Sequence, residues 1–243
     1  MIVLFTDFGL EGPYTGQVKA VLAREAPDAI VIDLMADAPM LRPQEAAYLL
    51  AAYVGAFPEN SIYLCVVDPG VGTDRPAEVL DIDGRRFVGP GNGLFEPLLR
   101  RANGVASFTI AAAPGISASF HGRDVFAPVA GKLARGLGPR EIGLASGSAT
   151  RRPDWPDDLA AIVYIDRYGN AMTGLRAAAL GQGVRLGIGG QAYARARTFQ
   201  EVAEGQGFWY ENANGLAEIA VNRGRADALP GVEIGAPIVI AGL

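Results

Sequence analysis

Residues 61–75 read Ser61-Ile-Tyr-Leu-Cys-Val-Val-Asp-Pro-Gly-Val-Gly-Thr-Asp-Arg75, and the fold can be predicted outward from this stretch. The apolar, β-branched run predicts a buried strand ending at Asp68, and the Pro-Gly-Val-Gly sequence predicts a loop leading to Arg75. Because ligands bind at the carboxyl ends of strands in open α/β sheets, this strand would deliver a carboxylate to such a site, with a guanidinium close by. On this stretch alone, an equally good reading is that Asp68 caps the turn and Arg75 is a solvated surface charge.

The composition limits the classes of protein to which the chain can belong. The chain has 243 residues, half of them hydrophobic, which is enough to bury a large core in one big domain or two modest ones. A net charge of -5 and an isoelectric point near 5.0 argue against nucleic acid or an anionic membrane as the main partner. The chain opens without a basic segment or a small-residue cleavage site, and no apolar run reaches membrane-spanning length. We therefore expect a soluble, cytoplasmic protein.

Cysteine and histidine each occur once, which limits metal chemistry. Cys65 lies inside the apolar strand, and we expect it to be core packing. A single histidine and a single cysteine exclude a structural zinc site. We expect neither a metal nor an organic cofactor.

The first part of the chain alternates strand and helix patterns. Strands are predicted at 2–5, 29–34 and 61–68, with helices at 14–25 and 43–56 between them. This alternation is typical of a largely parallel sheet. After it we expect a hairpin at 78–88 that turns at Asp83-Gly84, a helix at 94–101, a strand at 107–110 and a helix at 125–135.

The composition changes at 146–158, where Ser, Pro, Arg, Asp and Trp occur without periodicity. Beyond this segment, Gly and Asn turns separate short predicted strands at 160–165, 184–188, 208–211, 216–221 and 237–240. We therefore predict an α/β N-terminal domain over 1–150, with a mostly parallel sheet flanked by helices. A linker over 151–158 would join it to a smaller, all-β, barrel-like C-terminal domain over 159–243.

Acids and amides gather where the predicted strands end. Asp7 follows the first strand, Asp68 follows the third, and Asp166-Arg-Tyr-Gly-Asn170 follows the first strand of the second domain. Asn92 lies between two glycines, and His121 precedes Gly-Arg-Asp. These residues are the candidates for a functional site.

Each of these candidates also has a structural interpretation. The segment 166–170 could be an Asx turn, and Asn92 could be a left-handed residue tolerated for its backbone. Asp124 is expected to be the N-cap of the helix that follows it. A lone histidine such as His121 is about as often a satisfied structural residue as a functional one.

No spacing in the chain is a sharp catalytic motif by itself, since there is no G-x-S-x-G, P-loop lysine or H-E-x-x-H. Residue patterns alone indicate an α/β enzyme whose pocket contains carboxylates and at least one arginine. Such a pocket suits a small, polar substrate, which could be either neutral or cationic.

Six segments, in this order, together resemble a known enzyme family. They are Thr6-Asp-Phe-Gly9, Asp68-Pro-Gly-Val-Gly-Thr-Asp-Arg75, Pro90-x-Asn-Gly93, Phe120-His-Gly-Arg-Asp124, Asp166-x-Tyr-Gly-Asn170 and Ile219-Ala-Val-Asn222. Along nearly its whole length the chain resembles the S-adenosyl-L-methionine hydroxide adenosyltransferases, relatives of fluorinase and chlorinase. The resemblance implies an α/β domain followed by a β-barrel, homotrimers with active sites between subunits, and conversion of S-adenosyl-L-methionine and water into adenosine and L-methionine.

The resemblance also implies roles in the first domain. Asp68, Arg75 and His121 correspond to the set that handles the attacking water, and Asp7 to the carboxylate that binds the ribose hydroxyls. The leaving group is a neutral thioether, so no general acid is needed, and an arginine and a histidine beside the water favour its hydroxide form. The halogenases carry a tyrosine in place of Asp68 and lack the Arg–His partners, so the resemblance favours hydrolysis.

Further substrate-binding roles implied by the resemblance lie in the second domain. Asp166 and Asn170 resemble the pair that binds the methionine end of the substrate. Phe199 resembles the aromatic residue packed on adenine, and Asn222 lies where the adenine edge is read.

The chain departs from the family pattern at five positions. The family usually has aspartate where Gly12 and Gly91 stand, Thr-His where Met35-Ala36 stands, and serine where Ala213 stands. These departures leave the water-handling set intact and bear on affinity and on the preferred S-adenosyl compound. They motivate one alternative, a non-catalytic protein that binds adenosine or S-adenosylmethionine. A halide-using relative is a weaker alternative, because Asp68 argues against it.

Overall fold

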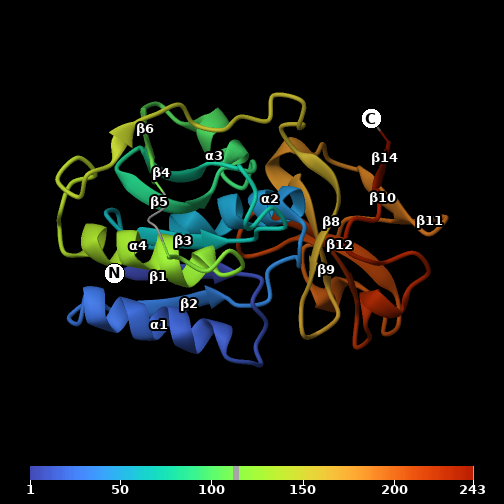
Figure 1. Cartoon of the computed structure of the whole chain (residues 1–243). Helices are drawn as coiled ribbons and strands as arrows, with labels where there is room; N and C mark the ends of the chain where they lie inside the picture. The colour runs from blue at the N-terminus through green and yellow to red at the C-terminus, as the bar shows by residue number, and fades with distance from the viewer. Residues whose placement is uncertain (112–114, 243) are drawn as a thin grey trace. The chain divides into compact units, whose positions relative to one another are not determined.

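Four parallel strands form one half of the first sheet (Figure 1). In the computed structural model, which describes residues 1–111 and 115–242, β1 (Ile2–Thr6) lies between β2 (Val31–Met35) and β3 (Ile62–Val66), and β3 pairs with β5 (Arg85–Pro90). All residues of β1 and β3 are buried, as their unbroken apolar sequences predict.

Three antiparallel strands extend this sheet beyond β5. Strand β4 (Ala77–Ile82) forms the predicted hairpin with β5, and β6 (Val105–Thr109) and β7 (Ala145–Ser146) follow in the order β2-β1-β3-β5-β4-β6-β7. Asp83 and Gly84 turn the hairpin with φ angles of 48° and 83°. Two consecutive positive φ angles are what a two-residue type I′ turn requires, so the Asp-Gly prediction is confirmed.

Helices α1 (Tyr14–Glu25) and α4 (Ala127–Ala134) lie side by side on one face of the sheet (Figure 1). Val18 and Leu22 of α1, with Leu133 of α4, belong to the same buried cluster as apolar residues of β1 and β3. The short π-helix η2 (Gly122–Phe126) runs directly into α4. On the other face, the ring of Phe87 stacks on Tyr63, with centroids 4.8 Å apart, and contacts Phe95 just before α3 (Glu96–Arg101).

The second part of the chain is built of two antiparallel sheets. One has the order β12 (Gly207–Glu211), β13 (Leu216–Val221), β9 (Ala171–Arg176), β8 (Leu159–Ile165), and the other β11 (Gln191–Tyr193), β10 (Arg185–Ile188), β14 (Val239–Ala241). The remaining elements here are the 3-10 turns η3 (Ala177–Ala179), η4 (Phe199–Glu201) and η5 (Ala226–Ala228). The sequence prediction missed β9 and β11, although β9 is central to its sheet.

Two isolated bridges join the edges of these sheets. Ala161 of β8 pairs with Pro237 before β14, and Arg195 after β11 pairs with Trp209 in β12. The Trp209 ring is fully buried, and its Nε1–H donates to the carbonyl of Val184 at 3.0 Å. Strand pairing therefore continues around a core, which agrees with the barrel-like class predicted for this part.

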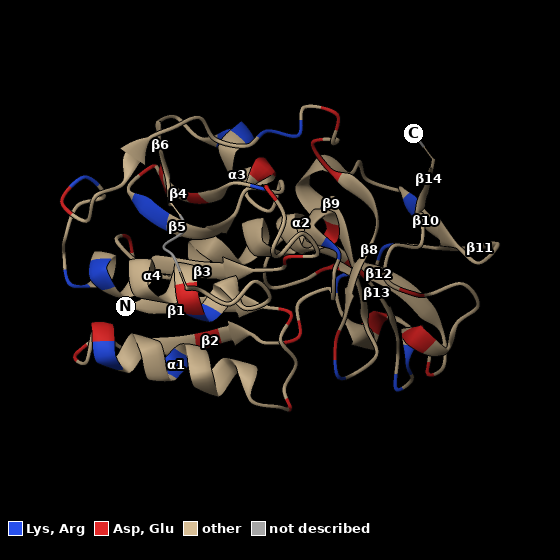
Figure 2. Cartoon of the chain, viewed as in Figure 1, with Lys and Arg blue, Asp and Glu red and all other residues tan. Residues whose placement is uncertain are grey.

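The described residues fall into two compact units. The first comprises Met1–Ala47 and Gly55–Arg152, and the second comprises Tyr48–Val54 and the chain from Pro153 onward. The early segment spans the second half of α2 (Pro43–Tyr53) and the first residue of η1 (Val54–Ala56). In the second unit, the Tyr48 hydroxyl donates to the carbonyl of Pro156, and the Tyr53 hydroxyl lies 3.5 Å from the sulfur of Met172. Acidic and basic residues are interspersed along both units (Figure 2).

Candidate functional site

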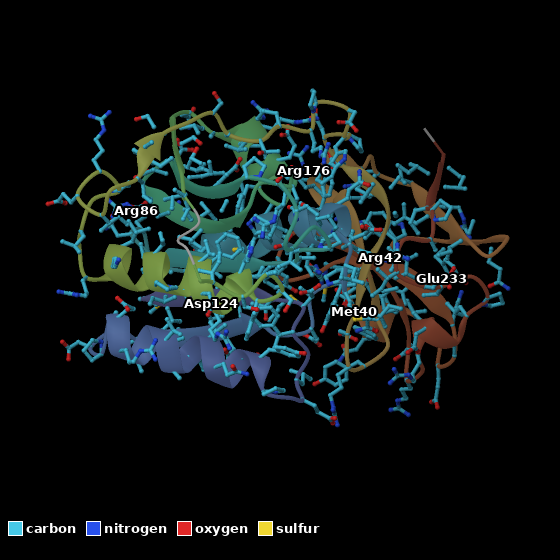
Figure 3. All side chains as sticks on the ribbon, viewed as in Figure 1. Met40, Arg42, Arg86, Asp124, Arg176 and Glu233 are labelled. Atoms are coloured by element: carbon cyan, nitrogen blue, oxygen red, sulfur yellow. The ribbon has the colours of Figure 1, made fainter. Side chains whose placement is uncertain are left out.

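A pocket of about 360 Å³ opens at the carboxyl ends of β1 and β3 in the first unit. Asp7 and Asp68, the acids that follow these two strands, both line it, and so does His121 from the loop before η2. Apolar side chains of Phe8, Tyr14, Met40, Leu41 and Phe120 complete much of the wall, and Met40 is labelled among the side chains in Figure 3. The predicted strand-end acids of this unit therefore meet at one site.

Arg75 connects Asp68 to His121. Its Nε donates to Asp68 Oδ1 at 2.8 Å, its Nη2 donates to Asp68 Oδ2, and Nη2 lies 3.0 Å from His121 Nδ1. The side chains are 4% exposed for Asp68 and 10% exposed for Arg75. Of the two readings of this stretch, the solvated surface arginine is therefore wrong, since the guanidinium is buried on a carboxylate and an imidazole.

The glycine-rich loop allows this approach. A Cβ on Gly72, whose φ is 80°, would lie 2.5 Å from the carbonyl oxygen of Ala118. Only glycine accommodates both the left-handed backbone and that contact. The loop that carries Arg75 is thereby packed against the segment that leads to His121.

The contact with Arg75 fixes the tautomer of His121. A guanidinium can only donate hydrogen bonds, so Nδ1 must accept, and the ring proton must reside on Nε2. Burial lowers the pKa of His121, and the charge of Arg75 lowers it further, against the opposing effects of Asp68 and Asp124. The imidazole is therefore neutral at physiological pH and offers one donor, Nε2–H.

Asp7 supplies the second carboxylate of the pocket. It accepts a hydrogen bond from the backbone N–H of Leu41 at 3.0 Å. Burial raises the pKa of Asp7, and the nearby charge of Asp68 adds to this, while backbone hydrogen bonds oppose it. A carboxylate in this setting is well suited to accept hydrogen bonds from hydroxyl groups or to face a cation.

The structure contradicts the purely structural interpretations of Asn92 and Asp124. Asn92 is not among the residues with positive φ; its Nδ2 donates to the carbonyl of Val67 at 2.8 Å, which holds the backbone just before Asp68. Asp124 is not an N-cap: the π-helix η2 begins earlier, with His121 at the cap position. The Asp124 carboxylate, labelled in Figure 3, instead accepts hydrogen bonds from the Arg123 guanidinium and the Ser117 N–H.

In the second unit, Asp166 and Asn170 close the turn between β8 and β9. The backbone N–H of Asn170 donates to Asp166 Oδ1 at 2.9 Å, and its amide Nδ2 lies 3.3 Å from Asp166 Oδ2. The geometry is thus that of an Asx-type turn, one of the two readings of this segment. It also leaves the carboxylate and the amide side by side.

Phe199 and Asn222 are connected through one loop of the second unit. Phe199 begins η4 and packs edge-on against Phe208 and Tyr210, with ring centroids 5.0 Å and 5.4 Å away. Asn222 follows β13 and donates from Nδ2 to the carbonyl of Val202 at 2.7 Å. An aromatic surface that is 36% exposed at Phe199 remains open to a partner.

Glu218 was missed by the sequence prediction. It lies in the middle of β13, is 2% exposed, and accepts hydrogen bonds from Tyr210 and Asn212. A charged residue inside the otherwise apolar strand Leu216–Val221 was the available signal, because an acid is rarely buried there without a specific reason.

A neighbouring carboxylate explains why residue 91 is a glycine. A Cβ at this position would lie 2.6 Å from both Glu78 Oε1 and Thr150 Oγ1. Glu78 is 2% exposed and accepts hydrogen bonds from the backbone N–H and hydroxyl of Thr150. The space for a side chain at 91 is therefore filled by the carboxylate of Glu78.

Clustered metal ligands and membrane-spanning helices are both absent from the described part of the chain. Within residues 1–111 and 115–242, no group of three or more His, Cys, Asp or Glu side chains is arranged to hold a metal ion. Over the same two ranges, no helix combines the length and apolar character needed to cross a membrane.

Comparisons with known proteins identify the family of the chain. A family model for the SAM hydroxide adenosyltransferase N-terminal domain matches residues 2–143, and the model for the C-terminal domain matches residues 160–239. The chain belongs to this family. A relative from Thermus thermophilus, named (R)-S-adenosyl-L-methionine hydrolase, is 40% identical over 98% of both chains. One from Salinispora arenicola with the same name is 35% identical over 95% of this chain and 93% of its own length.

Two solved structures are similar to this chain in fold. An uncharacterized conserved protein from Thermotoga maritima has a TM-score of 0.89 at 29% identity, over 99% of this chain and 100% of that chain. A conserved hypothetical protein from Thermus thermophilus has a TM-score of 0.78 at 37% identity, over 99% of both chains. The two-domain architecture predicted from the sequence is thus the architecture of the family.

Proposed function

We propose that this adenosyltransferase family member hydrolyses S-adenosyl-L-methionine to adenosine and L-methionine. The observation that carries the proposal is the buried Asp68–Arg75–His121 arrangement beside Asp7 in one pocket. The names of its relatives support the same reaction. Because those names specify the R epimer, we propose that this epimer is the preferred substrate.

In the proposed reaction the oxygen of water attacks C5′ of the substrate. The C5′–S bond breaks, its electron pair stays on sulfur, and the water proton is released, so that a sulfonium cation becomes a neutral thioether. Holding the water in line with the breaking bond supplies up to about 7–11 kcal/mol of the barrier in favourable model cases. No acid is required at the leaving group.

The tautomer of His121 defines its proposed role. Since Nδ1 already accepts a hydrogen bond from Arg75, its lone pair does not serve as the base for the water, and Nε2–H acts as a donor to the nucleophilic oxygen. A donor of this kind, next to a guanidinium, stabilises the hydroxide form of the water. Asp68 holds Arg75 in place through two hydrogen bonds.

The remaining assignments follow the family resemblance. Asp7 would accept hydrogen bonds from the ribose hydroxyls, Phe199 would pack on adenine and Asn222 would read its edge. Asp166 and Asn170 would bind the methionine end.

We further propose that the protein works in the cytoplasm as a homotrimer with active sites between subunits, without a metal or an organic cofactor. The resemblance supports the trimer, and it implies neither a metal nor an organic cofactor. The interspersed charges and an isoelectric point near 5.0 support small-molecule chemistry without nucleic acid or membrane partners (Figure 2).

The reaction is tested by incubating the purified protein with each sulfur epimer of the substrate in ¹⁸O-labelled water. Labelled adenosine together with methionine, formed faster from the R epimer, is the expected result. Substrate that binds tightly but stays intact would instead favour the alternative of a non-catalytic binding protein.

Variants test the proposed roles. His121→Ala and Arg75→Met should each lower turnover at least about a hundredfold, the usual contribution of a group that handles a reacting proton. Adenosine affinity should change little, because neither side chain is assigned to the nucleoside. Unchanged turnover in both variants would refute the assignment.

A further inference from the structure

Glu218 lies on the outer face of the β12-β13-β9-β8 sheet. Its strand neighbours Ala217 and Ile219 belong to the barrel core, so the alternation of side chains directs Glu218 away from that core. Tyr210 on β12 and Met172 on β9 are its partners across the two strand pairs. Although it faces outward, it is only 2% exposed.

The carboxylate oxygens of Glu218 accept hydrogen bonds from neutral side chains. The Tyr210 hydroxyl donates to Oε1 at 2.5 Å, and Nδ2 of Asn212 donates to Oε2 at 2.8 Å. Within the described residues, no lysine, arginine or histidine forms an ion pair with it. Burial raises the pKa of Glu218, which is the response expected of a carboxyl group without a cationic partner.

Glu218 also reaches the turn between β8 and β9. Asn170 lies two residues before Met172, the strand partner of Glu218, so the alternation of side chains places it on the same face of the sheet as Glu218. The amide of Asn170 lowers the pKa of Glu218, and the charge of Asp166 raises it, so both groups lie close to this carboxyl. The same amide nitrogen lies 3.3 Å from Asp166 Oδ2. With Nδ2 directed toward the Asp166 carboxylate, on the face that also holds Glu218, the Oδ1 of Asn170 is left as an acceptor for a ligand.

We infer that Glu218 is a positioning residue that orients Asn170 beside Asp166 for recognition of the α-ammonium group of the substrate. The inference rests on the proposed function. Asp166 and the Oδ1 of Asn170 are acceptors, the buried carboxyl of Glu218 lies behind them, and an ammonium group offers three donors and a positive charge. The carboxylate end of the amino acid would be repelled by the same groups. The amino group, not the carboxylate, is therefore what this part of the second unit selects.

The test compares S-adenosylmethionine with an analogue that carries a hydroxyl in place of the α-amino group. Glu218→Gln keeps the size of the side chain and removes its charge. We expect it to raise KM for S-adenosylmethionine by about tenfold to a hundredfold, the usual effect of losing a charged hydrogen bond, with little change in kcat. KM for the hydroxy analogue should stay near that of the unaltered protein.

Two matched variants separate positioning from packing. Tyr210→Phe removes one donor and keeps the carboxylate, so the preference for the amino compound should persist. Glu218→Asp keeps the charge and withdraws it from Asn170, so KM for the amino compound should rise more than KM for the analogue. Equal changes for both substrates in the Gln and Asp variants would show a merely structural role and overturn the inference.

Binding measurements distinguish this inference from the reaction itself. Calorimetry on the unaltered protein and on Glu218→Gln gives the ratio of affinities for the two compounds without requiring turnover. If the unaltered protein binds S-adenosylmethionine but forms no product, the proposed function fails, and the affinity ratio still decides the role of Glu218. A ratio that is the same in both proteins would refute that role even if hydrolysis is found.

Discussion

The buried pair of Asp68 and Arg75 should make the first unit sensitive to the loss of either charge. Asp68→Asn keeps the shape of the side chain but leaves a guanidinium that is 10% exposed with one neutral acceptor in place of a carboxylate. Breaking a buried ion pair from one side costs about 3–5 kcal/mol. Arg75 retains the carbonyl of Pro76 at 3.2 Å and the ring of Phe126 at 5.2 Å, so we expect the lower end, about 3 kcal/mol.

A double-mutant cycle measures this pair directly. Arg75→Met strands the Asp68 carboxylate in the same way, whereas the double variant removes both charges and should lose no more than the worse single variant. For a chain of this size, about 3 kcal/mol corresponds to a fall in Tm of about 6–12 °C. The assay is thermal unfolding, with the free energy of unfolding from denaturant titration. If the two single losses add to within about 0.5 kcal/mol in the double variant, the two side chains do not interact as described.

Three other predictions follow from the site. Burial and Arg75 lower the pKa of His121 from its ordinary 6.5, so NMR titration of this single histidine should place its protonation below pH 6.5. Turnover should be level above that transition and fall as the pH drops through it, and Arg75→Met should shift both transitions to higher pH. Gly91→Ala should lower the free energy of unfolding, measured with denaturant, by about 1–3 kcal/mol, because the added Cβ meets Glu78 and Thr150. The control Gly16→Ala in α1, whose Cβ meets nothing within 4 Å, should not destabilise the protein. Equal effects of the two variants would contradict the packing described at Gly91. Phe199→Ala should weaken adenosine binding in calorimetry by about 1–3 kcal/mol, and unaltered affinity would argue against stacking there.

The pattern of apolar residues in the sequence correctly predicted the strands whose residues are all buried. The unbroken apolar sequences of β1 and β3, and the Asp-Gly turn between β4 and β5, left little choice of structure. Strand β9 was missed because Thr173 and Gly174 interrupt its apolar character. The Thr173 hydroxyl is satisfied by the carbonyl of Ala217 on β13, a partner 44 residues away that no local pattern reveals.

The sequence was enough to predict which residues form the site, but not how their side chains are arranged. Asp7 and Asp68 could be placed at neighbouring strand ends because parallel strands end on the same edge of a sheet. That Arg75 reaches His121 depends on the contact of Gly72 with Ala118, a tertiary packing detail. The N-cap prediction for Asp124 failed for a similar reason, since the π-turn starts the helix three residues earlier than the sequence indicates.

The segment Tyr48–Val54 has a consequence for the order in which the protein can fold during synthesis. The contacts of Tyr48 and Tyr53 within the second unit span 108 and 119 residues of chain. Both tyrosines leave the ribosome long before Pro156 and Met172 are synthesised, so these two contacts can form only after the rest of the first unit has been made. The second unit is therefore not encoded by one continuous segment of the gene. A fragment that starts at Pro153 would lack the packing contacts that Tyr48–Val54 supplies to the barrel.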